Sequence, residues 1–480
     1  MSLITPARCA ALLCATLIAL PPLAAGESKG KAGSLLSDTP GYQANVAAGT
    51  TGHRFALYIP KQYATDLERK FPVLFCQHPG GNPAGEVNKW GPWAERFGVV
   101  VVGIIGPSNS MAQHEKPPIQ DAVAKTVVSE LRTHPQLRWT WGVSGGSADG
   151  ARFLRRKPDQ FAGACLVAAF GGPTGVKLNH LAFGIVQGGK DDICSAKGVL
   201  GEAITQWKTQ GNPLRWNLSQ MGAHTGGPPG AAEEMLTWLV WQGKLSAPFL
   251  TPDEHARHVA DAAAWAKTIA EDSDADRQMR EAALFLHLPT EAVPGFDKIA
   301  SLWRDRVLAA VSALSAPDRL AALSDALSGE RWQPTSYGKT DPKPCWIVTL
   351  GSSGGPHLPA EIRQSLDKEK NAAASDAAAA KDWDLLVKMR ACVLAEIDGG
   401  LDFDRAKAVF AAYETVAKVD PANRWCQQAA QHGARVRSYW ERKSPENAPA
   451  RAASASAATT TAPKEEPKSN DGAAPAPGAP

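Results

Sequence analysis

The alternation of short apolar runs with amphipathic stretches, repeated across the first half of the chain, constrains the fold more than any other feature. Runs such as 72–77 (PVLFCQ) and 99–105 (VVVVGII) are almost wholly apolar, as strands buried on both faces of a parallel sheet are. Stretches such as 119–133 and 230–243 carry apolar residues at helical spacing and can cover such a sheet. The pattern therefore predicts an α/β domain over residues 40–246. Further strands are expected at 54–60, 139–143, 163–169, 183–187 and 214–220, and further helices at 147–156 and 196–209.

The composition changes in the second half of the chain. Residues 253–330 and 359–441 are rich in Ala, Leu, Glu, Lys and Arg at helical spacing, with one strand candidate at 346–350 between them. This texture predicts a separate helical domain over residues 250–443, of unknown role. The segment 444–480 consists mainly of Ala, Pro, Ser, Thr and charged residues, which cannot fill a core, so we expect a disordered tail.

Residues 1–26 have the pattern of a signal peptide. Arg8 provides a positive charge, an apolar stretch follows, and the small residues 24–26 offer a cleavage site. The apolar stretch is short for a transmembrane helix, and an uncleaved anchor is the alternative. We therefore expect a secreted or periplasmic protein with no membrane span in its mature form.

The charge and cysteine patterns argue against several classes of protein. A net charge of +3 over 480 residues, with no long basic run, disfavours a nucleic-acid-binding protein. The chain has no C-x-x-C pair and no H-x-x-x-H spacing, so we expect no metal and no cofactor. Cys392 and Cys426 fall in helical segments, and an oxidising compartment would permit a disulfide between them.

A G-x-S-x-G sequence at 142–146 marks the candidate nucleophile, Ser144. A strand-like run precedes it and a helical stretch follows it, which is the context of a nucleophile elbow. In such an elbow the serine sits on a strained turn, so its hydroxyl projects above the sheet. The flanking glycines let the neighbouring backbone pass without a Cβ clash.

A second G-x-S-x-G sequence, at 351–355, also follows a strand-like run. Pro356 and Pro359 come directly after it, where the helix of an elbow would have to begin. Neither a carboxylate turn nor a glycine-flanked histidine follows downstream. Ser353 is therefore the weaker candidate, and a simple turn is the better interpretation.

A serine nucleophile needs a base and an acid, and in this kind of fold the acid precedes the histidine along the chain. The strand at 183–187 is followed by GGKDD, which places Asp191 or Asp192 at the carboxyl edge of the sheet. The next strand leads to GAHTGG, which places His224 in a glycine-rich loop. We prefer Asp191, because it completes G-x-x-D from Gly188. The alternatives are that an aspartate here caps the next helix and that the histidine is an ordinary loop residue.

The HPGG loop after the second apolar run is the candidate oxyanion hole. One backbone donor is expected from Gly145, directly after the nucleophile, and the other from this loop. Because Pro79 has no N–H, Gly80 or Gly81 is the expected second donor.

Trp90 and Trp93 follow the oxyanion loop and are weak candidates for a substrate subsite; alternatively, they pack a helix on the sheet. Little sequence is inserted between the strands to form a large lid, which favours a bulky or polymeric substrate. The helical domain is a candidate for contact with such a polymer or with the cell envelope, or it is a structural appendage.

Residues 54–245 resemble secreted esterases related to polyhydroxybutyrate depolymerases and feruloyl esterases. The segments that carry the resemblance are, in order, RFALYIP, FPVLFCQHPGG, WGPWAERFGVVVVG, WGVSGGSADGARF, GGKDD and GAHTGG. The resemblance implies an α/β-hydrolase fold and a serine esterase with Ser144, Asp191 and His224 as its triad. Such esterases often have His-Gly where this chain has His-Pro in the oxyanion loop.

The sequence thus predicts a serine carboxylic ester hydrolase, with an α/β-hydrolase domain, a helical domain and a tail, acting on a small or polymeric ester. A serine peptidase or an acyltransferase would use the same three residues. A non-catalytic, envelope-associated binding protein with a hydrolase-like scaffold is an alternative of another class, and a metal-dependent hydrolase is a third.

Overall fold

The computed structural model describes residues 38–169, 181–191, 193–194, 207, 209–220, 222–224, 230–337, 343–351, 356–399 and 403–441. The strands within these residues are β1 (Gly41–Ala47), β2 (Arg54–Ile59), β3 (Phe71–Gln77), β4 (Val100–Ile105), β5 (Thr133–Val143), β6 (Gly163–Val167), β7 (Ala182–Gly188), β8 (Leu214–Ser219), β9 (Arg331–Tyr337) and β10 (Lys343–Gly351). The α-helices are α1 (Gln62–Thr65), α2 (Ala84–Lys89), α3 (Gly91–Phe97), α4 (Lys116–Glu130), α5 (Gly145–Arg156), α7 (Ala231–Ser246), α8 (Pro252–Glu271), α9 (Ala275–Leu286), α10 (Phe296–Ser312), α11 (Ala316–Ser328), α12 (Ala360–Ala374), α13 (Ala377–Gly399), α14 (Phe403–Ala417) and α15 (Arg424–Glu441).

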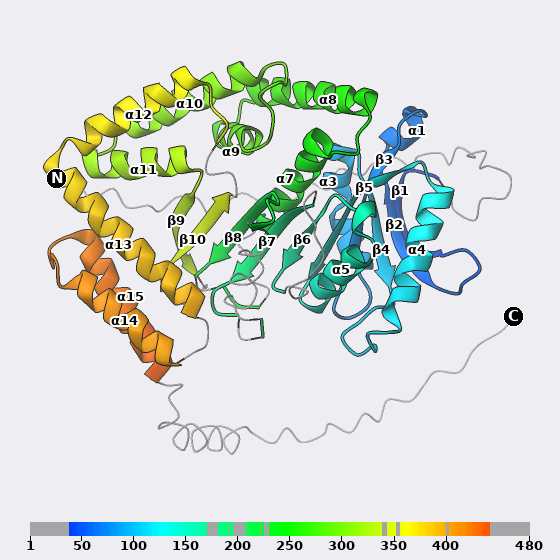
Figure 1. Ribbon diagram of the computed structural model, residues 1–480, viewed down its shortest axis with the longest axis horizontal. Helices are drawn as coiled ribbons and strands as arrows, with labels where there is room; N and C mark the ends of the chain where they lie inside the picture. The colour runs from blue at the N-terminus through cyan, green and yellow to red at the C-terminus, as the bar shows by residue number, and fades with distance from the viewer. Residues whose placement is uncertain are drawn as a thin grey trace, which may run out of the picture.

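The ten strands of the described chain form one sheet in the order β1-β2-β4-β3-β5-β6-β7-β8-β10-β9 (Figure 1). The strands from β4 to β8 in this order are parallel to one another. Antiparallel pairs flank them on both sides, β1–β2–β4 on one and β8–β10–β9 on the other. The mainly parallel sheet of an α/β-hydrolase fold, expected from the sequence, is confirmed.

Helices cover both faces of this sheet. Apolar residues of α4 and α5, such as Val123 and Phe153, pack in one buried cluster with the residues on one face of the central strands. Residues of α2, α3 and α7, such as Trp93 and Leu236, pack in a second cluster on the other face. Burial on both faces explains why the central strands are continuously apolar rather than alternating.

The sequence predicted a separate helical domain over 250–443, and the structure corrects this expectation. The chain between α11 and α12 contributes the hairpin β9–β10, and β10 pairs antiparallel with β8 of the central sheet. Helical residues such as Trp265 and Met389 belong to the same two buried clusters as the sheet residues. In Figure 1, α8–α12 arch along one side of the sheet, and α13–α15 lie beyond the hairpin. Sheet and helices therefore share both buried clusters.

Several expectations fall outside the described residues, namely the signal peptide at 1–26, Asp192, most of the helix at 196–209, Ser353 and the tail from 444.

None of the helices in the described ranges is both long enough and apolar enough to cross a bilayer. The thiols of Cys392 and Cys426 are free in the structure, so the disulfide that the sequence would permit is not formed there.

Candidate active site

Ser144 lies on a sharp turn between β5 and α5. Its backbone angles, φ 54° and ψ −127°, fall in a region that costs a non-glycine residue about 1–3 kcal/mol. The amide of Ser144 donates a hydrogen bond of 2.8 Å to the carbonyl of Val167 on β6, which holds the turn against the neighbouring strand. The strained turn between strand and helix is that of a nucleophile elbow.

The glycines of the G-x-S-x-G sequence are required by close backbone contacts. A Cβ at Gly142 would lie 2.4 Å from the carbonyl carbon of Gly146, and a Cβ at Gly146 would lie 2.4 Å from the carbonyl oxygen of Gln77. The Oγ of Ser147 lies 2.5 Å from the carbonyl oxygen of Gly142 and accepts from the amide of Val167 at 2.9 Å. The first turn of α5 is therefore fixed against the ends of β3, β5 and β6.

His224 joins the nucleophile to the acid. Its Nε2 lies 2.6 Å from Ser144 Oγ, and its Nδ1 lies 2.9 and 3.0 Å from the two carboxylate oxygens of Asp191. Since an ionised carboxylate can only accept, Nδ1 carries the ring proton and Nε2 presents its lone pair to the serine hydroxyl. The structure thus brings together the three side chains that the sequence placed at one edge of the sheet.

Asp191 is buried, with a residue exposure of 2%, and its carboxylate has several donors besides the histidine. The amides of Ile193 and Cys194 donate to Oδ1 at 2.9 and 2.7 Å, and Gln187 Nε2 donates to Oδ2 at 3.0 Å. These bonds fix the carboxylate in the orientation that selects the His224 tautomer. Gln187 was not singled out from the sequence, although a glutamine at the end of an apolar strand is a usable signal.

The loops that carry the acid and the base pack directly on each other. The amide of Lys190 donates to the carbonyl of Gly222 at 2.9 Å, and the amide of Gly189 donates to the carbonyl of Ser219 at 2.7 Å. A Cβ at Gly188 would lie 2.4 Å from the carbonyl oxygen of Gly222. The two glycine-rich loops therefore form one unit, whose internal geometry sets the distance between acid and base.

The expected oxyanion donors differ in their surroundings. Gly145 begins α5, and the first amides of a helix have no partner within the helix. By contrast, the amide of Gly80 donates to His78 Nδ1 at 3.0 Å, and the amide of Gly81 donates to the carbonyl of His78 at 2.9 Å. The side chain closest to a Cβ position at Gly145 is that of Asn109, which the sequence did not reveal. From that position its acceptor Oδ1 would lie 1.7 Å away and its donor Nδ2 3.1 Å away. Asn109 is therefore a second possible source of a donor.

Trp90 and Trp93 lie in the core, which corrects the weak prediction that they line a substrate subsite. Each residue is 4% exposed. The Trp90 ring packs against Trp141 of β5 with centroids 5.5 Å apart, and Trp93 Nε1 donates to Thr237 Oγ1 of α7 at 3.1 Å. Their volume fills the space between helices and sheet, which is the alternative that the sequence allowed.

Asp191, Cys194 and His224 are the one group of possible metal ligands among the described residues, with ligand atoms within 4.8 Å of one another. Burial and the charge of Asp191 raise the pKa of the Cys194 thiol, which disfavours the thiolate that a metal would bind. The other two side chains already bond to each other. This donor set fits a hydrogen-bonded acid–base pair better than a metal centre.

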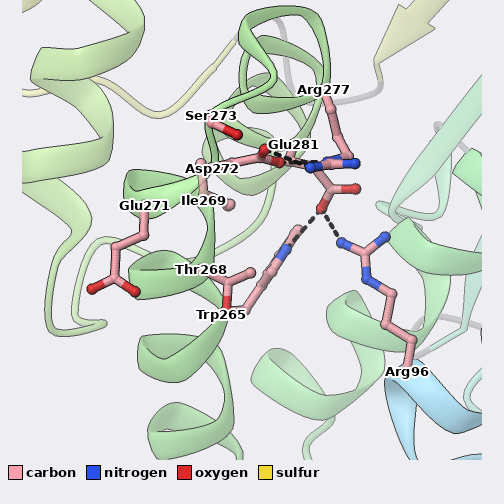
Figure 2. Close-up of a pocket in the computed structure, with 9 residues that line it drawn as sticks. All are labelled: Arg96, Trp265, Thr268, Ile269, Glu271, Asp272, Ser273, Arg277 and Glu281. Carbon is pink, nitrogen blue, oxygen red and sulfur yellow. Dashed lines mark hydrogen bonds and ion pairs between the residues drawn. The ribbon is translucent and has the colours of Figure 1, made fainter.

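A groove of about 530 Å³ lies between α3, α8 and α9, and none of the three triad residues lines it (Figure 2). Its main charges compensate one another. Glu281 accepts from Arg96 at 2.5 Å and from Trp265 Nε1 at 2.8 Å, and Asp272 pairs with Arg277. The cluster around Ser144 is therefore the better candidate for chemistry.

No known family model and no curated protein matches the sequence. Similar solved structures include a thermostable esterase, with a TM-score of 0.33 and 16% identity, covering 41% of this chain and 61% of that protein. A second is the fluorophosphonate-binding serine hydrolase F of Staphylococcus aureus, with a TM-score of 0.33 and 13% identity, covering 42% of this chain and 99% of that protein. A third is a ferulic acid esterase, with a TM-score of 0.31 and 15% identity, covering 38% of this chain and 92% of that protein. This chain thus matches about three fifths of the length of the thermostable esterase. The function has to be inferred from the geometry of the site.

Proposed function

We propose that this protein is a serine hydrolase of carboxylic esters that works through an acyl-enzyme. The observation that carries the proposal is the hydrogen-bonded chain from Ser144 through His224 to the buried Asp191. As Ser144 Oγ attacks the ester carbonyl, His224 Nε2 takes the hydroxyl proton, and Asp191 stabilises the resulting imidazolium. The imidazolium then protonates the leaving alcohol. Water, activated by the same ring, attacks the acyl-enzyme and releases the acid.

The negative charge on the carbonyl oxygen develops beside the start of α5. The amide of Gly145 and the helix N-terminus favour that charge. A second donor can come from the carboxamide of Asn109, or from the amide of Gly80 or Gly81 once substrate releases it from His78.

We further propose a bulky or polymeric substrate, such as an acetylated or feruloylated polysaccharide or a polyhydroxyalkanoate, met after export from the cell. Two exposed side chains near the site support an ester with both apolar and polar parts. Ile193, which is 69% exposed, lies two residues after the acid in the sequence. Asn109 is exposed in the loop that contacts Gly145.

The test compares p-nitrophenyl acetate and butyrate with a peptide p-nitroanilide, using the wild type, Ser144→Ala and Ser353→Ala. We expect the wild type and Ser353→Ala to hydrolyse the esters equally, and Ser144→Ala to have a kcat lower by on the order of 10⁴–10⁶-fold. Addition of a chelator should leave the rate unchanged.

Each competing function has its own outcome in this experiment. Faster cleavage of the anilide would identify a serine peptidase, and transfer of the acyl group to an added alcohol in preference to water would identify an acyltransferase. Undiminished ester hydrolysis by Ser144→Ala would contradict the proposal.

A further inference from the structure

A buried network of charged and polar side chains connects α13 to the loops that carry Asp191 and His224. Its centre is Glu396 on α13, with an exposure of 2%. Lys190 Nζ lies 2.8 Å from Glu396 Oε1, and Gln220 Nε2 donates to Glu396 Oε2 at 2.7 Å. Lys190 directly precedes the acid, and Gln220 follows β8 at the start of the loop that leads to the base. One carboxylate therefore contacts both catalytic loops.

Helices α14 and α15 complete the network on the other side of Glu396. Tyr413 on α14 donates its hydroxyl to Oε2 at 3.0 Å, and Arg435 Nη2 on α15 lies 3.0 and 2.9 Å from the two oxygens. The ring of His432 stacks on Tyr413 with centroids 5.8 Å apart, and its Nδ1 lies 3.3 Å from Gln220 Nε2. The network thus joins three helices to the sheet.

The charges of the network make Glu396 difficult to replace. Burial alone would raise the pKa of Glu396, but the charges of Lys190 and Arg435 lower it to about 2. Burial, together with Arg435, lowers the pKa of His432 to about 4, so this ring is neutral near pH 7. Glu396 is therefore the anion that compensates two largely buried cations, and buried charges without a partner are strongly unfavourable.

We propose that Glu396 is a positioning residue, which through Lys190 and Gln220 holds the acid loop and the base loop in register with Ser144. On this view the helical region is part of the catalytic unit. The inference rests on the proposed esterase function. A displacement of about 1 Å among reacting groups can cost on the order of 10²-fold in rate. Because the contacts of Glu396 are to residues beside the triad, we expect its loss to lower kcat and to leave KM nearly unchanged.

The experiment uses the full chain with Glu396→Gln, Glu396→Ala and a control, Asp384→Asn. Asp384 lies on the same helix, and its side chain is 60% exposed and paired with Lys388. The kinetic constants are measured with p-nitrophenyl butyrate, and the number of competent sites is counted by exhaustive labelling with a fluorophosphonate. We expect both Glu396 variants to lose about 10–100-fold in kcat per labelled site, with KM within about twofold of wild type and the control unchanged.

One further readout distinguishes positioning from general damage. The double variant Lys190→Met, Glu396→Gln should lose no more activity than the worse of the two single variants, because both changes remove the same contact.

Three outcomes would overturn the inference. One is an unchanged kcat per labelled site in both Glu396 variants, and another is an activity loss fully explained by fewer labelled sites. The third is a wild type that is neither labelled nor active on the ester. Only this third result also overturns the proposed function, so the two failures are distinguishable.

Discussion

The sheet edge at Asp191 and the helical region around Glu396 each contain a buried, fully bonded carboxylate, but the two differ in where their partners come from. Asp191 is bonded to Gln187 and to the amides of Ile193 and Cys194, all within a few residues, and to His224 one strand later. Two partners of Glu396 lie far upstream, Gln220 by 176 residues and Lys190 by 206. Two others lie downstream, Tyr413 by 17 residues and Arg435 by 39. A site built from local sequence can be recognised in the sequence, whereas a site built from distant segments cannot.

The partners also differ in charge. Asp191 is bonded to neutral donors and to the imidazole of His224, so its substitution should act on the chemical step. Glu396 is bonded to the cations Lys190 and Arg435, so its substitution should change the positions of the loops that carry Asp191 and His224. The predictions below test this difference.

The largest expected effect is that of Asp191→Asn. The asparagine amide would donate where the carboxylate accepts, so His224 would present the wrong tautomer to Ser144, and kcat should fall by on the order of 10⁴-fold. Kinetics with p-nitrophenyl butyrate measure the loss of kcat. The thermal melting temperature shows whether the variant is still folded, and we expect that it is. The control is Asp121→Asn, which removes surface ion pairs with Arg156 and Lys157. A loss below about tenfold would remove Asp191 from the triad.

Asn109→Ala should have the next largest effect, a decrease in kcat on the order of 10²-fold, as expected for the loss of one oxyanion donor. The reason is the contact of its carboxamide with Gly145, while the amides of Gly80 and Gly81 are bonded to His78. The neighbouring exposed Ser110→Ala serves as the control. An unchanged kcat would assign the second donor to the glycine loop instead.

Gly146→Ala tests the packing of the sheet edge rather than its chemistry. The new methyl group would lie 2.4 Å from the carbonyl oxygen of Gln77, and we expect the free energy of unfolding to fall by about 2–3 kcal/mol. Denaturant unfolding measures this change. Gly85→Ala on α2 is the matched control, because nothing lies within 4 Å of its Cβ position. Equal stability of the two variants would show that α5 can move away from β3.

The stability of the protein should depend on pH through His134 at the start of β5, where the sheet meets α8. This ring is buried, its Nδ1 accepts from the amides of Gln136 and Leu137 at 3.0 and 2.8 Å, and its Nε2 faces Glu254 of α8 at 3.4 Å. Burial lowers the pKa of His134 to about 4, although the charge of Glu254 acts in the opposite direction. The charges of His258 and Lys70 also lower this pKa.

Because the folded pKa lies below the unfolded one, the unfolded state binds the proton first as pH falls from about 6.5 to 4, and stability is lost over that interval. We expect this group to contribute a loss of about 1–3 kcal/mol between pH 7 and pH 4.5. His134→Asn keeps an acceptor for the two amides and does not titrate. Urea unfolding at both pH values should therefore show a smaller loss in the variant, and an equal loss would contradict the assignment.

The sequence predicted the central strands, the turn at Ser144 and the edge of the sheet at which Ser144, Asp191 and His224 meet, because each depends on local patterns. Apolar runs mark doubly buried strands, and glycines mark close backbone contacts. It missed β1, whose residues alternate irregularly between exposed and half-buried positions at the sheet edge. It also missed β9, which contains Pro334.

The remaining errors concern contacts between distant segments. The burial of Trp90 and Trp93 depends on β5 and α7, and the role of Glu396 depends on two loops and three helices. In the sequence Glu396 is one acidic residue in an ordinary helix. Only the tertiary arrangement shows that β10 continues the central sheet and that α13 contacts the loops that carry Asp191 and His224.

The most direct measurement is covalent labelling of the wild-type chain by a fluorophosphonate, with the modified residue located by mass spectrometry. The account predicts one adduct per chain, on the peptide that contains Ser144, and a labelling rate that falls sharply in His224→Ala. No adduct at Ser144, or an adduct at Ser353 in its place, would contradict it.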